Sequence, residues 1–177
     1  MYYVGDYSKI ILESGWVIKE ATSLTHEVNE IAFCGYFKDY PHENLLIPEI
    51  IEGRKFKSRY IPPRVGSMSS LPPHFTFQEV QLLLQDMMLA CLHIHKHGFT
   101  HHDIHLGNIL HENGKYILID FGCSKKDDDQ IGDIHALQGC INMLIHDDLV
   151  DDADIVLAET DALVEEYEEY LDTRQSR

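Results

Sequence analysis

The sequence predicts an α+β fold in which a small antiparallel β-sheet with one helix comes first and a mainly helical part follows. Three observations support this prediction. Short apolar runs bounded by turn residues dominate residues 8–61, longer segments with apolar residues at helical spacing dominate the rest, and one further hairpin lies among these helices. The chain of 177 residues is 44% hydrophobic, which is enough to bury a core.

The first part begins with a predicted hairpin and continues into a helix. Residues 8–12 and 16–19 form two predicted strands on either side of a Glu-Ser-Gly turn at residues 13–15. Residues 23–38 follow, with apolar side chains at the spacing of a helix. The positions that carry this helical pattern are Val28, Ile31, Ala32 and Phe33.

Two more predicted strands, residues 45–51 and 55–61, complete the first part. The Pro-Pro pair that follows, and the Gly- and Ser-containing run after it, break the strand pattern. We therefore place a boundary between two lobes near residues 61–65. Residues 1–62 are expected to form a small N-lobe and residues 63–177 a mainly helical C-lobe.

The second part opens with a strong helix signal. Residues 77–97 carry apolar side chains at helical spacing, and a loop over residues 98–107 follows. A second hairpin is expected next, because an Asn-Gly pair between two apolar runs favours a primed turn. Its strands are residues 108–110 and 116–119. Further helices are predicted over residues 134–145 and 153–171.

The negative charge of the chain is concentrated near its end. The formal net charge is −16, and residues 127–172 hold more than half of the 30 acidic residues and no Lys or Arg. This pattern argues against a nucleic-acid partner, because phosphate binding requires a basic face. Two interpretations of the acidic region remain: a solvated helical face that maintains solubility, or a docking surface for a basic partner.

The sequence also bears on where the protein acts. No window approaches the ~18 consecutive apolar residues of a membrane span, and the first residues lack the pattern of a signal peptide. The four cysteines are far apart and form no CxxC pair, as expected in a reducing compartment. We therefore expect a cytoplasmic protein that is not secreted and has no membrane partner.

Residues able to carry phosphoryl-transfer chemistry lie around the second hairpin. Asp103 and Asn108 are separated by four residues and follow His101, and an apolar strand leads directly to Asp120, which Phe and Gly follow. These motifs resemble the H-x-D-x-x-x-x-N catalytic loop and the D-F-G motif of the protein-kinase superfamily. The resemblance implies a two-lobed protein-kinase-like fold, with Asp103 as base and with Asn108 and Asp120 as Mg²⁺ ligands.

The sequence on either side extends the resemblance. Residues 92–98 are similar to the end of the long helix that precedes the catalytic loop in the family, and residues 132–139 resemble the start of a later helix. An Asp of that helix ties down the catalytic-loop backbone, which implies this role for Asp133. A simple helix N-cap is the alternative for Asp133. The resemblance also implies a structural role for His101 beneath Phe121.

A lysine near the N-terminus is the candidate for holding phosphates. Residues 16–19 resemble the V-A-I-K strand of the family, so Lys19 is expected to contact the α- and β-phosphates of ATP. The same lysine is expected to form an ion pair with a Glu of the next helix. Glu30 is the preferred partner, and Glu27 is the alternative.

The phosphate loop departs from the family pattern. When the start of the chain is aligned with G-x-G-x-x-G-x-V, Gly5 is the second glycine, while Tyr3 and Ser8 take the outer glycine positions. One glycine still lets backbone N–H groups approach a phosphate, and Ser8 is small. Gly5 and Ser8 are therefore the candidate phosphate-loop residues.

Two more departures bear on substrate and regulation. His105 stands where Ser/Thr kinases usually carry Lys, so residues 103–110 are similar to the D-x-H-x-G-N-I-L of aminoglycoside and choline phosphotransferases. Only residues 123–132 are available for an activation segment, and its A-P-E anchor is missing. The chain therefore resembles the miniature kinases of viruses and bacterial effectors. Its activity is expected to be constitutive or switched on by a partner.

The histidines do not add a metal site to this interpretation. The chain has 12 histidines, and several lie between residues 93 and 105. A helix would bring His93 and His97 to one face at ligand spacing, but no third ligand is evident, so zinc is not expected.

The motifs together predict an ATP-dependent protein kinase that uses Mg²⁺ or Mn²⁺, phosphorylates Ser or Thr and autophosphorylates. The first alternative is a binding module of kinase fold without turnover, because the phosphate loop is eroded. The second is a small-molecule phosphotransferase, because of His105 and the missing peptide-docking helices. The expected partner is a protein substrate or an activating protein, and a viral or effector chain would act in the host cytoplasm.

Overall fold

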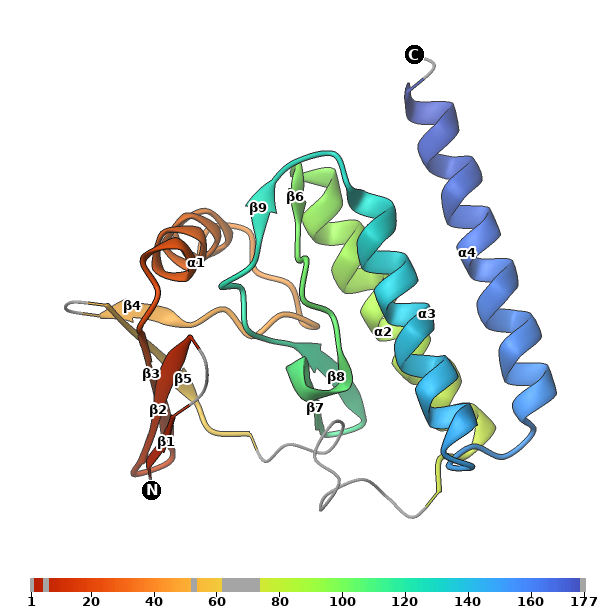
Figure 1. Ribbon diagram of the computed structural model, residues 1–177, viewed down its shortest axis with the longest axis horizontal. Coiled ribbons are helices and arrows are strands. Elements are labelled where there is room, and N and C mark those ends of the chain that lie inside the picture. The colour runs from red at the N-terminus through yellow and green to blue at the C-terminus, as the bar shows by residue number, and fades with distance from the viewer. Residues whose placement is uncertain (1, 5–6, 52–53, 62–73, 176–177) are drawn as a thin grey trace.

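The computed structural model describes residues 2–4, 7–51, 54–61 and 74–175. A β-sheet with one helix forms one side of the molecule, and three long helices form the other. Short strands and the predicted catalytic loop lie between these two parts (Figure 1). The α+β architecture predicted from the sequence is therefore confirmed.

The sheet has five antiparallel strands in the order β1-β2-β3-β5-β4. Their bounds are Tyr2–Val4 for β1, Ser8–Glu13 for β2, Trp16–Ala21 for β3, Glu49–Ile51 for β4 and Lys55–Arg59 for β5. The turn between β2 and β3 has positive φ at both Ser14 (49°) and Gly15 (84°), as a tight hairpin requires. The first hairpin predicted from the sequence is confirmed.

Helix α1 (Leu24–Phe37) buries Phe33, as its apolar pattern predicts, but leaves the other three positions of that pattern exposed. Val28, Ile31 and Ala32 are exposed, whereas the buried residues of this helix are Glu30, Phe33, Cys34 and Phe37. Aromatic packing explains this orientation, because Phe33 stacks on Phe121 at a centroid distance of 4.1 Å and meets Phe99 at 5.5 Å. These large rings bury more apolar surface than Val28 and Ile31 would.

The strand predicted over residues 45–51 is shorter in the structure, where β4 begins only at Glu49. Pro48 precedes it and has no N–H to donate to a strand ladder. The earlier part of the segment pairs elsewhere: the Leu46 N–H donates to Leu118 O at 3.1 Å, and the Leu118 N–H donates to Asn44 O at 2.9 Å. Residues 44–46 therefore link the sheet to the helical part.

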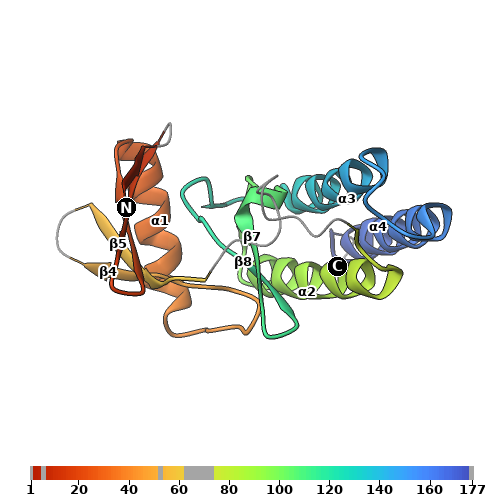
Figure 2. The same cartoon turned by 90° about the horizontal axis from the view of Figure 1, so that it is seen from below.

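The second part is built on three helices that lie against one another (Figure 2). Helix α2 (Phe77–Lys96) begins at its predicted residue, with a capping box between Thr76 and Glu79, and ends one residue before its predicted end. Helix α3 (Gln130–His146) begins four residues before its predicted start, and α4 (Ala153–Gln175) covers its outer side. The acidic residues before α3 suit its N-terminus, where the helix dipole is positive.

Two short β-pairs position the catalytic loop against these helices. Strand β6 (Phe99–Thr100) pairs with β9 (Lys125–Lys126), and β7 (Ile109–Glu112) pairs with β8 (Lys115–Leu118). The β7–β8 turn has positive φ at Asn113 (52°) and Gly114 (77°), which confirms the predicted primed turn. A 3₁₀ turn, η1 (Leu106–Asn108), leads into β7.

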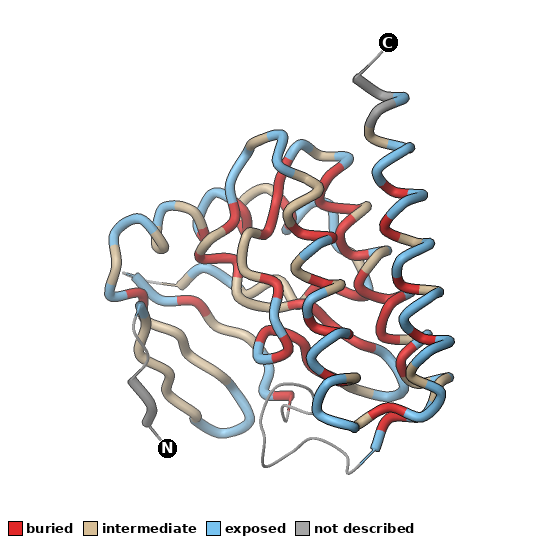
Figure 3. Tube along the Cα trace, turned by 45° about the vertical axis from the view of Figure 1, so that its right-hand side comes forward, coloured by how far each residue is buried: buried red, intermediate tan, exposed pale blue. Residues whose placement is uncertain are grey.

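Buried residues run continuously from α1 through the loop region to α4, whose outward side is exposed (Figure 3). Of the predicted lobe boundary, Ile61 is buried, and the remaining residues lie outside the described part of the chain. Within the described residues, no helix combines the length and the apolar character that crossing a membrane requires.

Candidate active site

Three charged residues from distant parts of the chain meet between the sheet and the loop region. Lys19 Nζ on β3 lies 2.8 Å from Glu30 Oε2 on α1 and 2.5 Å from Asp120 Oδ1, which follows β8. The side chains of Lys19 and Glu30 are 13% and 2% exposed. One ammonium therefore holds a strand, a helix and the segment after the second hairpin together.

Burial and mutual attraction set the ionisation of this cluster. Burial lowers the pKa of Lys19, but the charges of Asp120 and Glu30 outweigh it, so this pKa lies above 10.5. Burial raises the pKa of Glu30 to about 7, against the opposing pull of Lys19. Burial also acts to raise the pKa of Asp120, but Lys19 and the Gly122 N–H bring it below 3.8. Lys19 is thus a cation and Asp120 an anion at neutral pH.

The structure separates the two glutamates between which the sequence left a choice. Glu30 pairs with Lys19, whereas Glu27 Oε2 lies 3.0 Å from Arg54 Nε. The two glutamates are three positions apart on α1 and therefore lie about 60° apart around its axis. The packing of Phe33 and Phe37 turns Glu30 toward the sheet.

Asp103 and Asn108 are held together by the fold of the loop between them. The Asn108 Nδ2 amide donates to the Asp103 backbone O at 2.9 Å and to its Oδ2 at 3.0 Å. The η1 turn shapes this loop, and His105 Nδ1 accepts the Gly107 N–H at 3.0 Å. The Asp103 carboxylate stays partly exposed, while Asn108 is 7% exposed. Asp103 can therefore reach a substrate from a fixed position.

Aromatic packing fixes the position of the segment around Asp120. Phe121 is fully buried, stacked on Phe33 and in edge contact with His101 at 5.5 Å. His101 Nε2 donates to Ile119 O at 3.1 Å, and burial lowers the pKa of this imidazole below 6.5. Asp120 itself has φ of 65°, a left-handed conformation that persists in a non-glycine residue only where its surroundings hold it.

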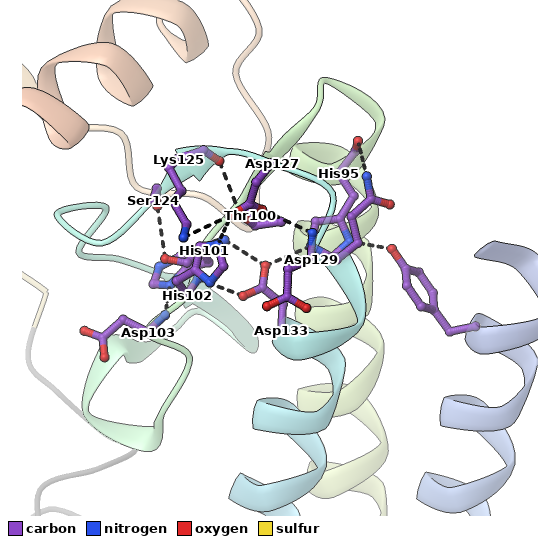
Figure 4. Close-up of polar contacts among 12 residues, drawn as sticks. His95, Thr100, His101, His102, Asp103, Ser124, Lys125, Asp127, Asp129 and Asp133 are labelled. Carbon is purple, nitrogen blue, oxygen red and sulfur yellow. Dashed lines mark hydrogen bonds and ion pairs between the residues drawn. The ribbon is translucent and has the colours of Figure 1, made fainter. Parts of the chain in front are cut away.

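Asp133 on α3 binds the backbone of the catalytic loop (Figure 4). Its carboxylate accepts the His101 N–H at 2.7 Å, the His102 N–H at 2.8 Å and the His95 Nε2–H at 2.8 Å. Burial raises the pKa of Asp133, but these hydrogen bonds outweigh it and keep the pKa low. The N-cap of α3 is Asp129, so the alternative reading of Asp133 as an N-cap is wrong.

A cavity of about 410 Å³ lies between the sheet and the loop region and reaches the charged cluster. Apolar side chains from the sheet and from the region of the second hairpin line it together with Lys19, Glu30 and Asp120. The lining includes Ile10, Val17, Phe56, Leu110 and Ile119. The apolar lining suits a flat base and Lys19 suits a phosphate chain, and the volume falls within the range of cofactor pockets.

The oxygen atoms beside Asp103 fit a hard divalent cation. Because the Asn108 amide nitrogen is bound to Asp103, its amide oxygen is the atom left for a metal. Asp120 adds a carboxylate whose Oδ1 already accepts from Lys19. Within the described residues, no group of three or more His, Cys, Asp or Glu side chains could hold a metal by itself. Mg²⁺ suits such a site because it takes one or two protein oxygens together with substrate phosphates.

The residues proposed for the phosphate loop are placed only in part. Gly5 lies outside the described residues. Ser8 begins β2 and is paired with Ala21 on β3. A short β1 precedes it and pairs with β2 across Tyr3 and Ile10. The strands predicted from the sequence begin only at residue 8.

Asp127 is a residue of the site that no sequence motif indicates. Its carboxylate contacts His102, the residue directly before Asp103, although the two are 25 positions apart. Asp127 is the first of three consecutive aspartates, and nothing in the local sequence distinguishes it from the other two. Only the pairing of β6 with β9 brings it to the loop.

Comparisons with known proteins agree with this geometry. A family model described as "Protein kinase domain" matches residues 17–137, which include Lys19, Asp103, Asp120 and Asp133. A non-specific serine/threonine protein kinase of Drosophila melanogaster is 29% identical over 105 residues. The matched stretch covers 57% of this chain and 16% of that protein. Because the family match spans more than half of the sequence, this chain belongs to the protein kinase domain family.

Proposed function

We propose that the protein is an ATP-dependent kinase that transfers a phosphoryl group to Ser or Thr hydroxyls of proteins. The observation that carries this proposal is the joint contact of Lys19 with Glu30 and Asp120 in the lining of the cavity. Protein kinases require this Lys–Glu ion pair and a metal-binding Asp to be in place together. The name of the Drosophila relative supports Ser or Thr as the acceptor.

Each polar residue of the site has a proposed task. Lys19 binds the α- and β-phosphates, and Gly5 and Ser8 belong to the phosphate loop in front of them. Asn108 and Asp120 hold Mg²⁺, or Mn²⁺ in its place. Asp103 orients the acceptor hydroxyl and takes its proton. When bound, the metal neutralises charge on the phosphate oxygens.

We further propose that activity is constitutive or partner-activated and includes autophosphorylation. Both members of the Lys19–Glu30 pair belong to this chain. The segment after Gly122 reaches β9 directly and then enters α3, which leaves little chain for an activation segment. A basic substrate or activating protein would dock on the acidic region of residues 127–172. We assign this docking to the start of α4, where Asp151, Asp152 and Asp154 carry the charge.

One observation favours a small-molecule acceptor as a second candidate. His105 Nε2 lies 3.8 Å from Asp103 Oδ2, and both side chains are partly exposed. An imidazole at this position would contact an acceptor or a phosphate beside the base, as the similarity to aminoglycoside phosphotransferases implies. The acceptor test below therefore includes small hydroxyl compounds.

Labelled ATP tests the proposal. The full chain is incubated with labelled ATP and Mg²⁺, alone and with casein, myelin basic protein, an aminoglycoside or choline. Asp103→Asn and Asp120→Ala are compared with Asp39→Asn, an exposed carboxylate beyond α1. Transfer to protein should fall at least ~100-fold in the first two variants and stay near wild type in the control.

The outcomes separate the candidate functions. Label in a protein that depends on Asp103 and Asp120 supports the kinase, whereas label only in a small compound supports the second candidate. No transfer by the wild type, together with no rise in melting temperature on adding ATP and Mg²⁺, would contradict nucleotide use altogether. A ligand at 100 times its Kd should add ~2.7 kcal/mol to the free energy of unfolding.

A further inference from the structure

The carboxylate of Asp127 contacts donors from two stretches of the chain, residues 100–102 and residues 125–129 (Figure 4). Its Oδ1 accepts from Thr100 Oγ1 on β6 at 2.6 Å and from the Asp129 N–H at 3.2 Å. Its Oδ2 lies 2.7 Å from His102 Nε2 in the catalytic loop and 3.2 Å from Lys125 Nζ on β9. Both oxygens are therefore engaged, and two basic residues face the same one.

These donors favour the ionised carboxylate. Burial acts to raise the pKa of Asp127, but hydrogen bonds from Thr100, His102 and Lys125 lower it to about 2. The side chain is only 26% exposed, so solvent competes with these contacts in part. Asp127 is consequently an anion throughout the range in which enzymes work.

The partner of Asp127 lies directly before the proposed catalytic base. His102 has φ of 62°, a left-handed conformation for a non-glycine residue. Its N–H is bound by Asp133 at 2.8 Å, and its side chain is bound by Asp127. Such a conformation is unfavourable by itself and persists where the surroundings impose it. Asp133 holds the backbone of His102, and Asp127 holds its side chain. Together they set the direction of the chain as it enters Asp103.

A resident carboxylate can replace a regulatory phosphate in this position. Kinase activation loops are ordered when an added phosphate pairs with basic side chains. Here the segment between Asp120 and α3 supplies its own anion, which pairs with His102 and Lys125. The contact needs no modification of the chain.

We propose that Asp127 is a positioning residue that holds His102 and thereby keeps Asp103 in its reactive place without phosphorylation. This inference rests on the proposed kinase activity. It makes Asp127 part of the reason why a chain with a short activation segment acts constitutively. Asp127 does not touch the reacting atoms, and its effect passes through His102.

The test compares three variants of the full chain. Asp127→Asn removes the charge with little change of shape, and Asp127→Glu restores the charge. Asp128→Asn removes the same charge from the exposed neighbouring position. The measurements are kcat, KM for ATP, melting temperature, and amide hydrogen exchange of residues 100–104.

Asp127→Asn should lower kcat roughly 10- to 100-fold, because a misplacement of about 1 Å at a reacting group can cost 100-fold. KM for ATP should stay within about twofold, since the cavity is not altered. The amides of His102 and Asp103 should exchange faster in this variant only. Asp127→Glu should regain most of kcat, and Asp128→Asn should match the wild type.

Other results would overturn the inference. If Asp127→Asn keeps the wild-type kcat, or if Asp127→Glu loses as much kcat as Asp127→Asn, the charge does not position the base. A fall in melting temperature without any change of kcat at a temperature where the variant is folded would leave Asp127 a purely structural residue. An inactive wild-type chain would instead contradict the kinase proposal. In that case, unchanged amide exchange of His102 in Asp127→Asn would show that Asp127 does not hold His102 in place.

Discussion

Oδ1 of Asp120 lies 2.5 Å from Nζ of Lys19, although the two residues are 101 positions apart. This contact joins β3 of the sheet to the segment that follows β8. Glu30 shares the same ammonium from α1. The relative position of the sheet, the helix and the second hairpin is therefore coupled to the charges that would bind a nucleotide.

The Lys19–Glu30 pair predicts unequal effects for two neighbouring glutamates. Glu30→Gln should lower kcat/KM roughly 100-fold, because Lys19 loses the carboxylate that orients it toward the phosphates. Glu27→Gln should remain within about twofold of wild type, since Glu27 pairs with the half-exposed Arg54. Steady-state kinetics with varied ATP concentration measure kcat/KM for both variants. Equal losses in the two variants would contradict the assignment of Glu30.

Asp120 predicts a loss of metal-dependent nucleotide binding. Asp120→Asn keeps the shape of the side chain but removes one charge from the proposed metal site. The rise in melting temperature caused by ATP with Mg²⁺ should largely disappear in this variant and persist in Asp39→Asn. Titrations with Mg²⁺ and with Mn²⁺ at constant ATP check the result. An unchanged rise in Asp120→Asn would exclude this carboxylate as a ligand.

The buried face of α1 predicts which of its residues stabilise the fold. Phe33→Ala should cost about 3–5 kcal/mol, because Phe33 is fully buried and stacks on Phe121. Ile31→Ala should cost about 0.5 kcal/mol or less, because Ile31 is 38% exposed. Urea unfolding of both variants measures the difference. A larger loss for Ile31→Ala would mean that the helix turns the other face inward.

Burial of His101 predicts a specific pH dependence of stability. Burial lowers the pKa of His101 below 6.5, so the unfolded chain binds this proton more readily than the folded one. The stability tied to His101 is therefore present above pH 6.5 and is lost as the pH falls through that value, by at most ~1.4 kcal/mol per pH unit. Glu30 acts in the opposite direction, because burial raises its pKa to about 7.

Comparing the pH dependence of stability between variants isolates the contribution of His101. The free energy of unfolding is measured in urea at pH 7.5 and pH 5.5 for wild type, His101→Asn and His146→Asn. The exposed His146 serves as the control, with its side chain 89% exposed. His101→Asn should reduce the loss between the two pH values, and His146→Asn should not. An identical pH dependence in all three would contradict the buried neutral imidazole.

The start of α4 predicts a separation between docking and catalysis. Replacing Asp151, Asp152 and Asp154 by Asn should weaken binding of myelin basic protein, with most of the effect at low salt. Autophosphorylation should change much less, because α4 lies on the outer side of the helical part, away from the sheet (Figure 1). The control neutralises Glu165, Glu166 and Glu169 on the same helix, which are also exposed. Equal loss of binding and autophosphorylation would refute a separate docking surface.

Local signals were sufficient for several elements. The approximate bounds of α2 follow from helical spacing, and both hairpins follow from turn residues between apolar runs, which are properties of neighbouring residues. The distances along the chain from Asp103 to Asn108 and from there to Asp120 were also visible as motifs. These features depend on residues close together in the sequence, so the sequence indicates them without knowledge of the tertiary packing.

Other features depended on contacts between distant segments. The apolar pattern of α1 included Phe33 together with Val28, Ile31 and Ala32. Only Phe33 is buried, because its stacking on Phe121 turns its side of the helix inward. Pairing of residues 44–46 with Leu118 shortened the predicted strand. The periodicity of apolar residues cannot indicate these contacts, because the residues that make them are more than 70 positions apart.

The sequence by itself determined the α+β class, the order of the elements and the residue types that phosphoryl transfer requires. Tertiary structure decided which glutamate meets Lys19 and which aspartates hold the catalytic loop. Asp127 and Asp128 are chemically identical neighbours, and only the pairing of β9 with β6 brings Asp127 to His102. The physical reason is that a carboxylate acquires its role from the donors that surround it, and folding alone assembles those donors.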